Sequence, residues 1–147
     1  MFLPWEAREK INIYIAAPDF DYVNRTYIEL LTESLKYHNF KPRRPVQENG
    51  QMEFDAESSR REEIYNKDMT LLSECQLLIA VLINNDPGTL IEIGLAAAKS
   101  MGTFVYDPYN QATNCILTQL PHFISNDLDE LIAEVFIFAS KLNSVHE

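Results

Sequence analysis

Acidic side chains at two points of the sequence lie where a merely solvated carboxylate is not expected. Asp68 comes four residues after Ile64 and three before Leu71, so it falls on the apolar stripe of a predicted helix. Burying an unpaired charge is costly or forces a raised pKa, and such a group is usually paired, hydrogen-bonded or functional. A carboxylate that caps neighbouring backbone, or one rotated to the edge of the stripe, would explain the position without chemistry.

Glu92 is the second such carboxylate. It lies six residues after Asp86, in the first turns of a predicted helix that follows a strand, and it interrupts the small and apolar run LIEIGLAAA. The helix dipole would favour the ionised form of both acids and so keep a nucleophilic carboxylate charged at neutral pH. Acidic residues are common in first helical turns, which is the ordinary explanation. Together, Glu92 and Asp68 could supply a nucleophile and a proton donor.

Two further features bear on the ligand. Tyr14 lies midway along an apolar run, where a buried hydroxyl needs a partner, although composition alone favours a core role. The turn Asp86-Pro87-Gly88-Thr89 offers backbone donors that could bind phosphate. However, it has one glycine, no GxGxxG and no GK[ST], and Asp86 would repel a phosphate. A neutral, nucleoside-like ligand therefore fits better than a nucleotide.

The elements that must position these residues alternate between strand and helix. Apolar, β-branched runs predict strands at residues 11–17, 76–83 and 103–106, and the two prolines of residues 40–46 allow only a short edge strand. Helical spacing predicts helices at residues 23–38, 58–74 (capped by Ser58 or Ser59), 87–101 (capped by Asp86) and from Asp127 onward, with a loop at residues 47–57. This alternation predicts an α/β fold with a parallel sheet and right-handed crossovers.

In such sheets, ligands bind beyond the carboxyl ends of the strands. We therefore expect the site to collect Tyr14, the loop after the first strand, the NNDPGT turn and the loop after TFVYDP.

Composition limits the organisation and the partners. The chain has 147 residues, 46% of them hydrophobic, which predicts one domain spanning residues 1–147. A net charge of -10 argues against nucleic acid or an acidic membrane as partner. There is neither a signal-like start nor an apolar run of membrane-spanning length, so we expect a cytoplasmic protein. The sequence predicts buried free thiols at Cys75 and Cys115, and no metal site from the scattered His38, His122 and His146.

Four segments, in this order, resemble the nucleoside 2-deoxyribosyltransferases: IYIAAP, YNKD, NDPGTLIEIGLAAA and TNCIL. The resemblance spans residues 11–142 and is most specific at residues 86–94, where an acid and a glycine-containing turn precede a Glu-x-Gly. It implies a flavodoxin-like three-layer α/β sandwich with a five-stranded parallel sheet. It also implies a homo-oligomer, a dimer or hexamer with a shared active site, and no cofactor or metal.

The resemblance also implies a role for each matching residue. Glu92 would be the nucleophile, Tyr14 would orient it, and Asp68 would protonate the departing base. Asp86 would hold the 5-hydroxyl of the sugar, together with Asn114 from a neighbouring subunit. Two groups would complete the substrate site: Gly88 in the turn, and base-contacting candidates among Gln47, Asn49 and Gln51.

The implied activity is transfer of a 2-deoxyribosyl group between nucleobases in nucleoside salvage, with deoxynucleosides and free bases as partners. The chemistry is consistent, because a carboxylate can trap an oxocarbenium-like state while a second acid protonates the leaving group. An N-glycosidase acting on deoxynucleosides or their 5-monophosphates would use the same acids, and Arg43 or Arg44 near the 5-position would favour the monophosphate. A non-catalytic flavodoxin-like binding module is the third alternative.

Overall fold

A five-stranded parallel sheet forms the centre of the computed structural model, which describes residues 3–145. The strands lie in the order β2-β1-β3-β4-β5. Their bounds are β1 Asn12–Ala16, β2 Lys41–Arg43, β3 Leu77–Val81, β4 Gly102–Tyr106 and β5 Phe123–Ser125. The chain order reverses between β1 and β3, and this is the flavodoxin-like arrangement that the family resemblance implied.

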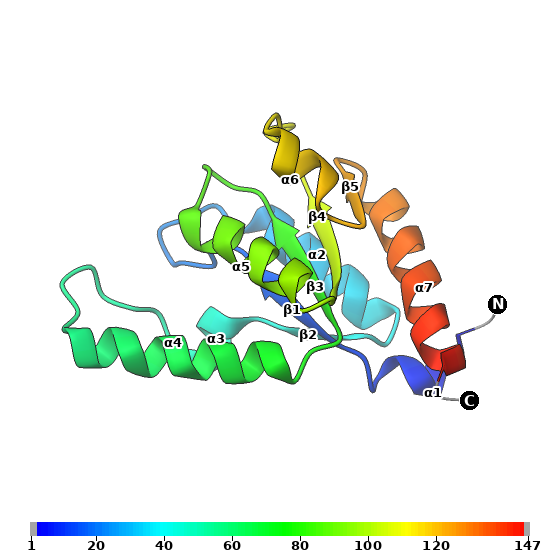
Figure 1. The fold of residues 1–147 in the computed structure, drawn as a ribbon, viewed down its shortest axis with the longest axis horizontal. Coiled ribbons are helices and arrows are strands. Elements are labelled where there is room, and N and C mark those ends of the chain that lie inside the picture. Colours follow the sequence, from blue (N-terminus) through cyan, green and yellow to red (C-terminus); the bar gives the residue numbers. More distant parts are fainter. Residues whose placement is uncertain (1–2, 146–147) are drawn as a thin grey trace.

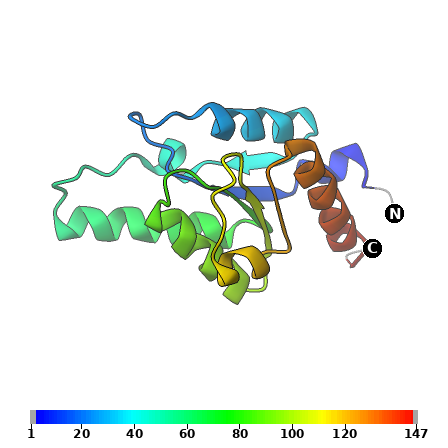
Figure 2. The ribbon, with the colours of Figure 1, turned by 90° about the horizontal axis from the view of Figure 1, so that it is seen from above.

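Helices cover both faces of the sheet, giving three layers (Figure 1). Seen from above, α2 lies on one side of the sheet, and α4 and α5 lie on the other (Figure 2). The helices are α1 Trp5–Arg8, α2 Thr26–Tyr37, α3 Pro45–Asn49, α4 Ser58–Ser73, α5 Pro87–Ala98, α6 Cys115–Gln119 and α7 Leu128–Val145. The loop before α4 and the start of α4 extend past the sheet (Figure 1).

The period of two along β1 assigns its side chains to different layers. Ile13 and Ile15 pack into the core shared with α2 and α7. Tyr14 and Ala16 point to the opposite face, into the core shared with α4 and α5. Tyr14 therefore faces the two helices that carry the candidate carboxylates.

Several sequence predictions of local structure were wrong. Helix α3 occupies the start of the predicted loop at residues 47–57, and it shortens the predicted edge strand to β2. Pro45 begins this helix because its missing N–H is not needed at the first position. Glu57 occupies the N-cap position of α4 with no side-chain cap bond, so neither Ser58 nor Ser59 caps it.

The caps predicted for the other two helices are present. Asp86 accepts from the backbone N–H of Thr89 at the start of α5, and Asp127 accepts from the N–H of Glu130 in α7. Of the two cysteines, Cys75 is buried as predicted, whereas Cys115 is exposed. No helix within residues 3–145 has the length and apolar character needed to cross a membrane.

Candidate active site

A cavity of about 330 Å³ opens beyond the carboxyl ends of the neighbouring strands β1 and β3, between which the chain order reverses. This is the place that the strand order predicts for a ligand. Its walls come from the loop after β1, from α3 and the loop after it, from α4 and from the start of α5. The lining residues are Ala17, Phe20, Pro45, Val46, Gly50, Met52, Ile64, Tyr65, Asp68, Met69, Asp86, Gly88, Ile91, Glu92 and Leu95.

Glu92 enters this cavity from the second turn of α5. The hydroxyl of Tyr14 donates a hydrogen bond to Glu92 Oε2, which leaves Oε1 without that bond. Burial raises the pKa of Glu92 to about 7, the bond from Tyr14 opposes this, and the charges of Asp68 and Asp86 add to it. Burial therefore opposes the helix dipole, which the sequence analysis expected to keep Glu92 charged at neutral pH.

Asp68 enters the same cavity from α4, partly buried beside Met69. Its Oδ1 accepts a hydrogen bond of 3.0 Å from Asn49 Nδ2. Burial raises the pKa of Asp68, and the bond from Asn49 partly offsets this effect. The cavity thus brings together the two carboxyl groups that lie 24 positions apart in the sequence, as the family resemblance implied.

Asp86 and Gly88 line the cavity beside Glu92, at the N-terminus of α5. Asp86 Oδ2 is engaged by the N–H and the hydroxyl of Thr89, at 3.0 and 2.8 Å. This capping leaves Oδ1 to contact a ligand. Two left-handed residues, Asn84 and Asn85, form the turn that sets up the helix start.

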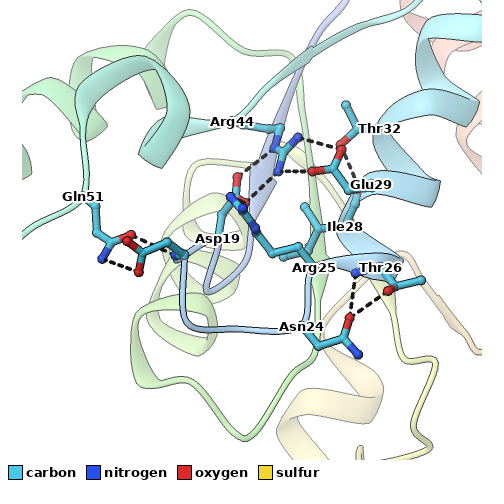
Figure 3. Close-up of polar contacts among 10 residues, drawn as sticks. Asp19, Asn24, Arg25, Thr26, Ile28, Glu29, Thr32, Arg44 and Gln51 are labelled. Carbon is cyan, nitrogen blue, oxygen red and sulfur yellow. Dashed lines mark hydrogen bonds and ion pairs between the residues drawn. The ribbon is translucent and has the colours of Figure 1, made fainter.

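An ion-pair cluster surrounds the buried Asp19 (Figure 3). Arg44 binds Asp19 through two bonds of 2.7 Å and also contacts Glu29 at 3.1 Å, while Arg25 lies 3.8 Å from Asp19. Asp19 is only 2% exposed, and it precedes Phe20 in the loop after β1. The cluster therefore joins the loop that carries Phe20 to the segment that begins α3.

Neither candidate arginine lines the cavity. Arg44 is held in this cluster, and Arg43 is paired with Glu48 at 2.8 Å and Glu74 at 3.3 Å. The lining contains three carboxylates and no lysine, arginine, histidine or serine. Such a lining would repel a phosphate.

Other predicted binding residues lie outside the lining. Gln47 is exposed on α3, and Gln51 exchanges hydrogen bonds with Asp21 at the rim. Asn49 touches Asp68 rather than the cavity. Asn114 is exposed on the far side of α5, where its Oδ1 caps α6 and it lines a second cavity of about 390 Å³.

The loop after β4 was also expected at the site, and this expectation was wrong for the single chain. Its residues line other cavities, with Asp107 Oδ1 and Oδ2 accepting from the N–H groups of Gln111 and Ala112. Asn114 does not line the cavity of Glu92 in the single chain, and the family resemblance places it there from a neighbouring subunit. That contribution stays a prediction.

No described group of three or more His, Cys, Asp or Glu side chains is arranged to hold a metal ion, and His146 lies outside the described residues. Cys75 is not a candidate nucleophile, since burial raises the pKa of its thiol to about 12.

The strand order defines a flavodoxin-like protein. At the point where that order reverses, an apolar cavity holds two carboxyl groups, and such a pair is suited to cleaving a glycosidic bond. Comparison with family models gives a match to nucleoside 2-deoxyribosyltransferase over residues 13–130. The chain therefore belongs to the nucleoside 2-deoxyribosyltransferase family, whose members act on the N-glycosidic bonds of nucleosides. A comparison with curated protein sequences gave no significant match.

Three solved structures share the fold. A 2-deoxyribosyltransferase from Bacillus psychrosaccharolyticus is similar with a TM-score of 0.70 and 17% identity, covering 81% of this chain and 88% of the other. The CMP N-glycosidase BcmB of Clostridium botulinum gives 0.59 and 21%, covering 86% and 98%. A conserved protein of Enterococcus faecalis V583 gives 0.56 and 22%, covering 84% and 86%.

Proposed function

We propose that this chain transfers the 2-deoxyribosyl group of a nucleoside from one nucleobase to another through a covalent sugar ester of Glu92. The observation that carries the proposal is the shared cavity, in which Glu92, held by Tyr14, faces the same space as Asp68.

The first step breaks the bond between the sugar and its base. Glu92 Oε1 attacks the anomeric carbon, because Oε2 already accepts from Tyr14. The base leaves with the bonding electron pair and takes the proton of Asp68. An oxocarbenium-like transition state, which is easier to reach without a 2-hydroxyl, is stabilised by the developing Glu92 ester.

The second step reverses the first with a new base. A ring nitrogen of the incoming base attacks the anomeric carbon and displaces Glu92 as a carboxylate, while Asp68 takes the proton released from that nitrogen. Two inversions give overall retention. Transfer outcompetes hydrolysis where water is excluded, which the apolar walls of Phe20, Met52 and Leu95 favour.

A nucleoside suits this lining better than a nucleotide. The three carboxylates and the absence of a cationic or seryl side chain from the lining oppose a 5-phosphate. Asp86 Oδ1 offers an acceptor to a 5-hydroxyl. A CMP N-glycosidase shares the fold, so hydrolysis is the second outcome that the assay must resolve.

The deciding experiment is base exchange. The protein is incubated with a 2-deoxynucleoside and a second free base, and the products are separated by chromatography. A new deoxynucleoside supports the proposal, free 2-deoxyribose indicates a hydrolase, and an unchanged mixture supports a binding module. Glu92→Ala is expected to abolish exchange with the fold intact, whereas Glu62→Ala, at an exposed glutamate on α4, is expected to retain it.

A further inference from the structure

Asn49 contacts the proposed proton donor from outside the cavity. Its Nδ2 lies 3.0 Å from Asp68 Oδ1, and its own side chain is absent from the lining. An amide nitrogen only donates, so Asp68 Oδ1 must act as an acceptor in this bond. A proton on Oδ1 would make that oxygen a poorer acceptor and weaken the bond, so the bond favours a proton on Oδ2.

We infer that Asn49 is a positioning residue that holds the carboxyl group of Asp68 in one orientation, with Oδ1 as acceptor and Oδ2 presenting the proton to the base. This inference rests on the proposed function. It gives Asn49 a different role from the base contact that the family resemblance suggested.

The local structure is built to hold Asn49 in place. Asn49 is the last residue of α3, a helix begun by the buried Pro45 and packed against α4. Gly50 ends the helix at a φ of 99°, a value that favours glycine, and its N–H donates to Val46 O at 2.9 Å. The amide therefore approaches Asp68 from a fixed point of the backbone.

Two ionisable groups face Asp68 from the other elements of the site, Glu92 on α5 and Tyr14 on β1. Asp86 lines the same cavity. Among the described contacts, none of these groups donates a hydrogen bond to Asp68. Asn49 is therefore the residue that distinguishes Oδ1 of Asp68 from Oδ2 in the described part of the chain.

The test separates proton donation from general damage by varying the leaving base. Deoxynucleosides of one base class, chosen from those that the wild type exchanges, are compared with increasingly electron-withdrawing substituents on the base. For poor leaving bases, Asn49→Ala is expected to reduce kcat by about tenfold or more, because positioned proton transfer contributes about 10²–10⁴-fold. For the most electron-withdrawing bases, which leave without a proton, we expect a loss below about twofold.

Asn66→Ala is the matched control, because Asn66 is an exposed asparagine on α4, two residues before Asp68. It is expected to leave the dependence on the leaving base unchanged. Asn49→Asp is a near-isosteric second variant that places an acceptor against Oδ1, and the same selective loss is expected from it. It also tests the inference if the alanine variant folds poorly.

Equal losses across the whole base series, or no loss in either variant, would overturn the role of Asn49. Failure of the proposed function looks different, since the wild type itself would then not exchange one base for another. Hydrolysis without exchange keeps the inference testable, because release of the base needs the same proton.

Discussion

Replacing Glu92 with glutamine should make the protein more stable at alkaline pH while abolishing its activity. The side chain keeps its size, and its amide oxygen can still accept from Tyr14. What changes is the charge. Burying a carboxylate in an apolar cavity costs free energy, and this desolvation is the main cause that raises the pKa of Glu92 from 4.5 to about 7.

The sign follows from proton binding. Because the folded protein binds the Glu92 proton more tightly than the unfolded chain, this contribution to stability is complete below pH 4.5 and is lost as the pH rises to about 7. Each pKa unit corresponds to about 1.4 kcal/mol, so the loss is at most about 3.5 kcal/mol. The glutamine of Glu92→Gln carries no charge at any of these pH values, so the variant should not show this loss of stability.

Urea unfolding of wild type and variant at pH 5 and pH 8 measures the effect. The free energy of unfolding of the variant relative to wild type should rise by about 2–3 kcal/mol between the two pH values. Glu62→Gln, at an exposed position on α4, should show no such rise. A relative stability of Glu92→Gln that is the same at both pH values would refute the burial and the raised pKa assigned to Glu92.

Further variants test the surroundings of this group. Tyr14→Phe removes the bond that lowers the pKa of Glu92, so the rise of kcat/KM with pH should move to higher pH than in wild type; no movement would contradict the bond. Asp86→Asn keeps an N-cap but removes a charge that raises the same pKa, so its profile should move to lower pH, and a movement upward would contradict the assignment. Arg44→Met leaves the buried Asp19 with only Arg25 at 3.8 Å, so it should lower the free energy of unfolding by about 3 kcal/mol in urea titrations. A change below about 1 kcal/mol would show that the pair of Arg44 and Asp19 is not desolvated.

The sequence was sufficient to place the main chemical groups because they follow strong periodic signals. Tyr14 alternates with buried aliphatic residues along β1, and Asp68 repeats at helical spacing with Ile64 and Leu71. The parallel sheet then forces the end of β1 and the start of α5 to the same edge. The location of the cavity therefore follows from the order of strands and helices.

The parts that were missed are short or depend on contacts between distant segments. Helices α3 and α6 have five residues each, and β5 has three, so each is too short for a repeating apolar pattern to be recognised. Asn114 was a recognisable N-cap for α6, followed by the apolar pair Ile116 and Leu117. By contrast, the bond between Asn49 and Asp68 exists only because α3 packs against α4, which no local pattern encodes.

Burial has two linked consequences for the proposed reaction. The same apolar walls that keep water from a sugar ester also remove water from Glu92, and this raises the pKa of the nucleophile to about 7. Near neutral pH, protonation of Glu92 would then compete with its role as nucleophile. A more open cavity would ionise Glu92 fully but would admit water to the ester. The bond from Tyr14 reduces this conflict, because it stabilises the carboxylate without solvent. Selection for transfer over hydrolysis therefore favours a buried carboxylate with a tyrosine donor over an exposed one.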